Sequence, residues 1–203
     1  MRSLCAAAIC AVCTLAQAET PPVQVDIGAE KPPKLLSAYH LFKDNAKQIP
    51  NDGVIPYDLN TPLFSDYAEK HRFVWMPKGA PAKYDNTEAF DFPVGTVLIK
   101  TFSFLHDIRD ASKGERIVET RLLIRKPKGW IGLPYVWKDD MSDAELKIAG
   151  KQVAVTWTHY DGKERSNKYI VPNTNQCISC HENAKKLYSM QKARMPLPQF
   201  EVN

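Results

Sequence analysis

The sequence predicts a mainly β (α+β) fold, in which short N-terminal helices and a C-terminal helix flank an antiparallel β-sheet body. The first observation is that residues 95–172 hold successive runs of β-branched and aromatic residues. Glycine, proline or aspartate bounds each run, as is typical of short antiparallel strands. The second is that apolar residues at helical spacing precede this stretch, and a segment of helical propensity follows it.

The body is expected to begin with a helix over residues 35–48, where Leu35, Leu36, Tyr39 and Phe42 follow helical spacing. A short helix capped by Ser65 is expected over residues 65–70. The expected strands are 72–77, 95–105, 116–127, 132–139, 144–150, 151–160 and 166–172. Turn residues predict hairpins at 126–130 and 160–164. The last expected element is a helix over residues 181–194.

Length and composition suit one globular domain. The chain has 203 residues, of which 44% are hydrophobic, and its formal net charge is +4. This charge is weak and no run of lysine or arginine accompanies it, so we expect no nucleic-acid partner.

The first 18 residues are typical of a secretory signal peptide. Arg2 precedes an apolar run from Leu4 to Leu15, and Ala16-Gln17-Ala18 gives a small-x-small cleavage site. The run is too short for a permanent transmembrane helix, although a membrane-anchored N-terminus is the alternative. No later segment resembles a transmembrane span. We therefore expect export to the periplasm, a proline-rich leader at residues 19–34 and one β-rich domain at residues 35–203.

Residues 177–181, CISCH, form the motif that carries most of the functional information. C-x-x-C-H is the attachment signature of c-type haem, in which both thiols add to porphyrin vinyl groups and the histidine binds iron. Once residues 1–18 are removed, Cys177 and Cys180 are the chain's remaining cysteines, which excludes a disulfide framework. We therefore expect one covalent haem c on Cys177 and Cys180, with His181 as the proximal iron ligand.

Two other chemistries use paired cysteines. A structural zinc site needs about four ligands, and neither further cysteines nor suitably spaced histidines supply them. A thioredoxin-like pair lies in a βαβ unit, whereas this motif follows a β-rich stretch. A β module without haem, whose CxxC is a thiol redox pair, stays as an alternative.

The ligand on the distal side of the iron is left open by the sequence. Met190 follows the motif on the same expected helix, which makes the opposite haem face hard to reach, and it could simply pack that helix. His159 shares a strand face with Val153, Val155 and Trp157, and such a histidine can equally be structural. A five-coordinate iron would be open to small ligands.

Two stretches together resemble a known group of haem proteins. FPVGTVLIKTF (92–102) and CISCHENAK (177–185) are similar to the cytochromes c′-beta and their hydroxylamine-oxidising relatives. The resemblance implies an exported β-rich protein with a five-coordinate haem near its C-terminus. It also implies roles for Lys100, which matches a lysine cross-linked to the porphyrin in the hydroxylamine oxidisers, and for Glu119, which matches a pocket carboxylate.

The residue pattern leaves both of these roles open. Lys100 shares a strand face with Leu98, Phe102 and Phe104, so it either extends along an edge or points into a pocket. Glu119 lies on the strand face opposite an apolar one, a pattern that also fits a carboxylate facing solvent.

A longer resemblance covers most of residues 35–190. IPYDLNTPLFSDYAEKHRFVWMPKG (55–79) and GWIGLPYVW (129–137) are similar to poorly characterised exported bacterial c-type cytochromes, often with two haems. Longer members carry a second CxxCH, so this chain is expected to be a one-haem version or a truncated product.

Taken together, the motif and the resemblances favour a periplasmic electron carrier with a redox partner protein. The alternative is a haem protein that binds or oxidises a small gaseous or nitrogenous ligand, with Lys100 and Glu119 in its pocket.

Overall fold

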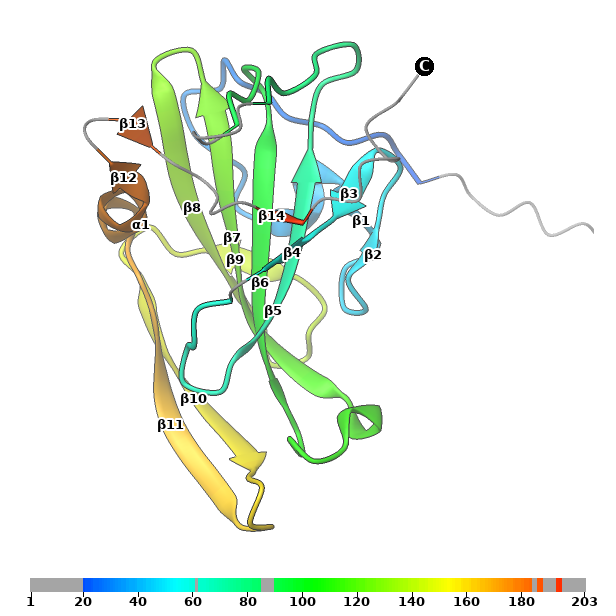
Figure 1. Ribbon diagram of the computed structural model, residues 1–203, viewed down its shortest axis with the longest axis vertical. Helices are drawn as coiled ribbons and strands as arrows, with labels where there is room; N and C mark the ends of the chain where they lie inside the picture. The colour runs from blue at the N-terminus through cyan, green and yellow to red at the C-terminus, as the bar shows by residue number, and fades with distance from the viewer. Residues whose placement is uncertain (1–19, 61, 85–89, 184–185, 188–192, 195–203) are drawn as a thin grey trace, which may run out of the picture.

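A computed structural model describes residues 20–60, 62–84, 90–183, 186–187 and 193–194, with the backbone alone after Cys177. Its main element is a six-stranded antiparallel sheet in the order β3-β5-β6-β7-β8-β9 (Figure 1). These strands are β3 (Val54–Pro56), β5 (Glu69–Trp75), β6 (Val97–Leu105), β7 (Glu115–Lys126), β8 (Gly129–Trp137) and β9 (Ala144–Leu146). The predicted antiparallel β body is confirmed.

The two predicted hairpins are also confirmed. β7 and β8 pair up to Lys126 and Gly129, which leaves Pro127 and Lys128 as a two-residue turn. The second hairpin joins β10 (Lys151–Thr158) to β11 (Glu164–Val171), which form a separate two-stranded sheet.

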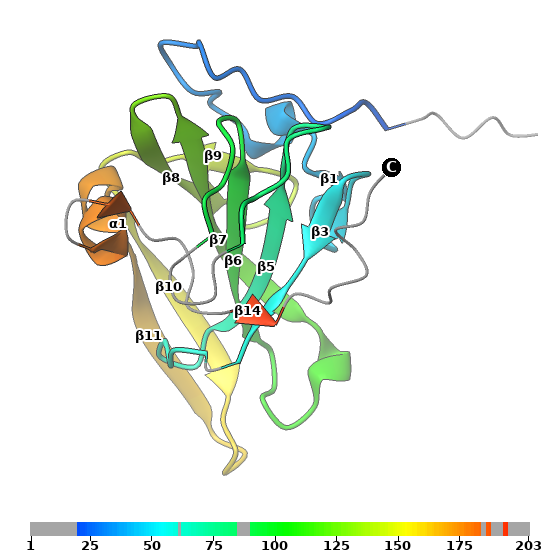
Figure 2. The same ribbon diagram turned by 45° about the horizontal axis from the view of Figure 1, so that its top comes forward.

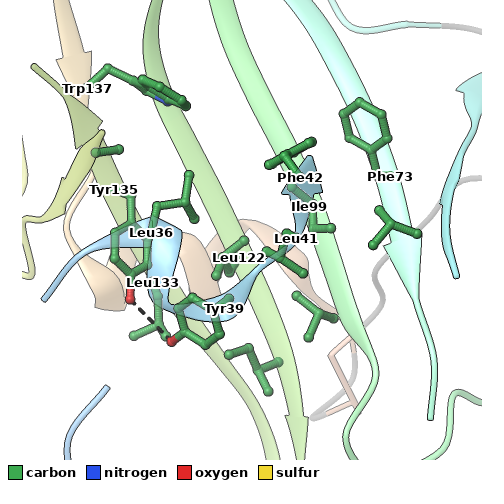
Figure 3. Close-up of a cluster of buried hydrophobic side chains, with 14 of the residues drawn as sticks. Leu36, Tyr39, Leu41, Phe42, Phe73, Ile99, Leu122, Leu133, Tyr135 and Trp137 are labelled. Carbon is green, nitrogen blue, oxygen red and sulfur yellow. Dashed lines mark hydrogen bonds between the residues drawn. The ribbon is translucent and has the colours of Figure 1, made fainter. Parts of the chain in front are cut away.

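Both faces of the large sheet are covered, which explains why its central strands are buried almost throughout. One face packs against the N-terminal segment, which contributes Leu36, Tyr39, Leu41 and Phe42 to the largest hydrophobic cluster (Figure 3). There the hydroxyl of Tyr135 donates a hydrogen bond to the Pro33 carbonyl (2.8 Å), and it lies 3.2 Å from the Tyr39 hydroxyl.

The helix expected over residues 35–48 is wrong. A single 3₁₀ turn, η1 (Leu36–Tyr39), is followed by β1 (Phe42–Asp44) and β2 (Ile49–Pro50). His40 ends the turn in the left-handed conformation, with φ 52°. The spacing of the apolar residues therefore reflects one turn followed by a strand, in which Leu36, Tyr39 and Phe42 are buried and Leu35 is exposed.

The helix expected over residues 65–70 is wrong for a similar reason. Asp66 and Tyr67 both have positive φ, 46° and 66°, which no right-handed helix allows. The segment is a tight turn closed by a hydrogen bond from the Ala68 amide to the Ser65 carbonyl (2.8 Å), and β5 begins directly after it.

The second face of the sheet is covered in part by the β10–β11 hairpin. Val155, Trp157 and Tyr169 from the hairpin pack with Phe102 and Phe104 of β6. The other described elements are η2 (Ala111–Lys113), α1 (Thr174–His181) and four short strands, β4 (Asp58–Leu59), β12 (Glu182–Asn183), β13 (Lys186–Leu187) and β14 (Ala193–Arg194).

The α-helix in the described part of the chain contains the CISCH motif, whereas the expected helix follows it. β12 pairs with β13, and β14 pairs with β4, so these residues form strands. The remaining residues of the expected helix, 184–185 and 188–192, lie outside the described residues.

Candidate functional site

The motif lies on α1, directly after the β10–β11 hairpin. Asn173 begins the helix, because its side-chain oxygen accepts from the Gln176 amide and the Gln176 side chain accepts from the Asn173 amide, both at 2.9 Å. This reciprocal pair is a capping box, and it fixes where the helix starts. Asn173-Thr-Asn-Gln176 is the sequence signal that would have placed the helix correctly.

The helix docks on β8 through Cys177. The side chain of Cys177 is 5% exposed and lies over Gly132. A Cβ added at Gly132 would be 2.7 Å from the Cys177 Cβ and 3.6 Å from a methyl group of Leu123. Gly132 and Leu123 are register partners on β8 and β7, so the absence of a side chain at Gly132 lets the helix approach the sheet closely. Figure 2 shows α1 beside β8.

Cys180 and His181, the other two residues of the expected haem attachment site, follow Cys177 on α1. The backbone of Cys180 and His181 lies in α1, one turn after Cys177, but their side chains lie outside the described residues. Met190 also lies outside them. Among the described side chains, no group of three or more His, Cys, Asp or Glu could hold a metal ion.

An apolar cluster covers the sheet face on which Cys177 sits. Its buried members are Val74, Phe92, Leu98 and Leu123. Ile55, Tyr57, Met76, Ala82, Phe90 and Trp130 pack around them and are partly exposed. Val74, Leu98, Leu123 and Gly132 are successive register partners across β5 to β8, so the cluster runs across the sheet as far as α1.

Lys100 lies in the middle of β6 on the same face as Leu98. Its Nζ is 4.9 Å from the centre of the Phe102 ring. Burial, together with the positive charges of Arg121, Arg72 and Lys70, lowers the pKa of Lys100 to about 8, against a small opposing effect of Glu119. Lys100 therefore points into a part-buried, cationic site.

The neighbours of Lys100 in register are both arginines. Arg72 on β5 pairs with Lys100, and Lys100 pairs with Arg121 on β7. We call Arg72, Lys100 and Arg121 the cationic row. It runs across the sheet beside the apolar cluster, two positions along each strand from Val74, Leu98 and Leu123. The sequence analysis missed Arg72 and Arg121, because only the register brings them together.

Glu119 is fully buried, at 0% exposure, so the interpretation as a solvent-facing residue is wrong. Arg121 donates hydrogen bonds to both of its carboxylate oxygens, and the hydroxyl of Tyr169 donates to Oε2 at 2.7 Å. Glu119 thus ties β7 to the hairpin. The strand pattern was misleading because both faces of β7 are covered, so a residue opposite the apolar face is buried as well.

Arg121 connects Glu119 to the motif. Burial lowers the pKa of Arg121, but hydrogen bonds and charge from Glu119, with smaller contributions from Tyr169 and Cys177, outweigh burial and raise it. Arg121 therefore lies within electrostatic range of the Cys177 sulfur.

His159 lies far from α1. It follows the last residue of β10, at the turn of the hairpin, whereas α1 follows the opposite end of β11 (Figure 1). Eight paired residues separate the two ends, about 25 Å at 3.3 Å per residue. His159 instead contacts the Tyr67 ring at 5.1 Å and lines a cavity of about 300 Å³. This separation argues against His159 as an axial ligand.

No family model, curated protein or solved structure matches the chain. No helix in the described part of the chain is long and apolar enough to cross a membrane.

The residues near the motif fit a tetrapyrrole with acidic side chains. Such a group needs an apolar surface for its ring and cationic groups for its carboxylates. The apolar cluster and the cationic row provide both on one sheet face, next to a buried thiol.

Proposed function

We propose that the protein is an exported, periplasmic c-type cytochrome that carries one covalent haem and transfers electrons. Cys177 and Cys180 would hold the porphyrin through thioether bonds, and His181 would bind the iron from the proximal side. The spacing of these three residues in CISCH is the chemical basis of the proposal.

The observation that carries the proposal is where α1 docks. Cys177 lies over Gly132 and Leu123, at the edge of the apolar cluster, and the cationic row crosses the same face. A porphyrin ring attached to α1 would lie beside the apolar cluster, whose partly exposed member Trp130 could cover it. Burial of this kind excludes water and, together with axial ligation, sets the reduction potential.

When bound, haem supplies an iron that cycles between two oxidation states and so carries one electron. The chain holds it covalently, which prevents its loss outside the cytoplasm. A second periplasmic redox protein would then accept or donate the electron.

Covalent haem is tested by producing the chain with the haem-attachment machinery and extracting it with acid–acetone. The pyridine haemochrome spectrum of the extracted protein should show about one haem per chain. Cys177→Ser and Cys180→Ser should each weaken attachment, whereas Ser166→Ala on the exposed face of β11 should retain it. Complete extraction of haem from the wild-type chain would contradict the proposal.

Lys100 favours a second candidate function, in which a five-coordinate haem binds or oxidises a small nitrogen species. Burial keeps the pKa of Lys100 near 8, so a neutral amine is accessible to it close to physiological pH. A high-spin ferric spectrum would favour this function, and a low-spin spectrum would favour electron transfer. A peptide mass showing Lys100 joined to the porphyrin would identify the lysine as part of the site.

A further inference from the structure

The cationic row places three positive side chains on adjacent strands. Arg72, Lys100 and Arg121 are direct register partners on β5, β6 and β7. Neighbouring strands lie about 4.8 Å apart, so the Cβ atoms of the row span roughly 10 Å. Like charges directly opposite one another destabilise a sheet, and this arrangement therefore needs compensation.

The carboxylates in the described part of the chain compensate the row incompletely. Glu119 pairs with Arg121. Asp58 accepts a hydrogen bond from Arg72 Nη1 at 3.0 Å, but its side chain is 79% exposed, so solvent weakens its effect. Lys100 makes no hydrogen bond or ion pair with any described residue, and its contact is the Phe102 ring.

Arg72 provides a second, independent indication. Its side chain is 5% exposed, and its Nε has no hydrogen-bond partner among the described residues. A buried guanidinium nitrogen without a partner costs about 1–3 kcal/mol or more, and native proteins rarely leave one in this state. An acceptor from outside these residues would satisfy it.

We propose that Arg72, Lys100 and Arg121 form a binding site for a carboxylate or a similar small oxyanion. Arg72 offers its unpartnered Nε, and Arg121 keeps its Nη1, which none of its bonds to Glu119 and Tyr169 uses. With the Lys100 ammonium as a point charge, these donors suit two or three oxygens that share one negative charge. The anion would sit against Lys100, whose side chain is partly exposed and so can be reached from solvent.

The anion can come from two sources. One is a propionate of haem attached to α1, and this source rests on the proposed function. The other is a free oxyanion that binds beside the apolar cluster. Both place the same chemistry on the same three side chains.

The test follows Lys100 directly by NMR. Lysines of the full chain are reductively methylated with ¹³C, which retains their charge. The Lys100 signal is assigned with Lys100→Gln, and the exposed Lys168 is the internal control. Acetate is titrated at constant ionic strength, first into haem-free chain. The Lys100 signal should move saturably, with half-saturation in the millimolar range, and its pKa should rise, while Lys168 should not saturate.

Three further measurements distinguish a haem propionate from a free oxyanion, and the anion site from the proposed haem function. Haem-loaded chain should lose the acetate response if a propionate occupies the row, and should keep it if the ligand is a free oxyanion. Arg72→Lys should weaken acetate binding several-fold, because it removes the fork of donors but retains the charge. A Lys100 shift that is linear and equal to that of Lys168 in haem-free chain overturns the anion site. Failure to attach haem overturns the proposed function alone, since the haem-free arm is unaffected.

Discussion

The hydroxyl of Tyr169 on β11 donates a hydrogen bond of 2.7 Å to the fully buried carboxylate of Glu119 on β7. This bond joins the β10–β11 hairpin to the large sheet, and Arg121 pairs with the same carboxylate from the cationic row. Burial raises the pKa of Tyr169, and the charge of Glu119 raises it further, so the phenol stays protonated as a donor. Since α1 follows β11 directly, the Glu119 contacts also fix where the motif lies.

Replacement of Glu119 by glutamine should destabilise the fold strongly. It leaves the part-buried Arg121 without its charge partner, which costs about 3 kcal/mol or more. Tyr169→Phe removes one hydrogen bond and should cost about 1 kcal/mol. Urea unfolding measures both values. The exposed Glu164→Gln is the matched control, and an equal, small effect of Glu119→Gln and Glu164→Gln would show that Glu119 is not structural.

The pair formed by His71 and Glu115 predicts a dependence of stability on pH. His71 Nε2 lies 2.8 Å from Glu115 Oε1, and this hydrogen bond raises the pKa of His71 above its usual 6.5, although burial opposes it. The stabilisation is therefore fully present below pH about 6.5 and is lost as the pH rises through the folded-state pKa. Because the His71 side chain is 37% exposed, we expect about 0.5–1 kcal/mol.

The measurement compares the free energy of unfolding of wild type and His71→Gln at pH 5.5 and pH 8.5. The difference between the two proteins should be larger at pH 5.5. Burial raises the pKa of Glu115, but hydrogen bonds from His71 and Ser103 lower it overall, so Glu115 remains charged at both values. A larger difference at pH 8.5 would contradict this assignment.

A buried chain of three polar side chains gives a third prediction. Trp137 Nε1 donates to Thr120 Oγ1 at 3.0 Å, and Thr120 Oγ1 lies 2.8 Å from Thr101 Oγ1. Thr120→Val should cost about 1–3 kcal/mol in urea unfolding, because it leaves a buried indole donor without an acceptor. Thr156→Val, on the exposed face of β10, should change stability by less than about 0.5 kcal/mol. Similar effects of both substitutions would refute the assignment.

The sequence predicted the longer strands, β5 to β8, β10 and β11, because burial and turn residues are local signals. Val97, Ile99 and Leu122 follow strand periodicity, and Gly129 and Gly162 lie at the predicted turns. The helix predicted over residues 35–48 is wrong because a 3₁₀ turn followed by a strand can bury apolar residues at the same spacing as a helix does. His40, with its positive φ, gives no clear signal in the sequence.

The candidate site was only partly predictable for a related reason. Cys177 and Lys100 each belong to a recognisable local pattern. Arg72 and Arg121 become relevant only through register, which depends on a bulge where Phe102 faces Glu119 and Ser103 faces Ile117. Pairing between strands far apart in sequence cannot be obtained from the periodicity of any one strand.

Gly132→Ala tests the docking of α1 with a single methyl group. The added Cβ would lie 2.7 Å from the Cys177 Cβ, and Gly132 lacks a positive φ, so the effect is purely steric. Overpacking of this kind costs about 1–3 kcal/mol, which should be relieved by local opening of the helix. In haem-free chain carrying Cys180→Ser, the buried Cys177 should then react with a thiol reagent about tenfold faster or more.

Gly28→Ala is the control, because its added Cβ meets its nearest atom at 3.4 Å. An unchanged Cys177 rate in Gly132→Ala would mean that the helix does not rest on β8, and the site built on that contact would fail with it.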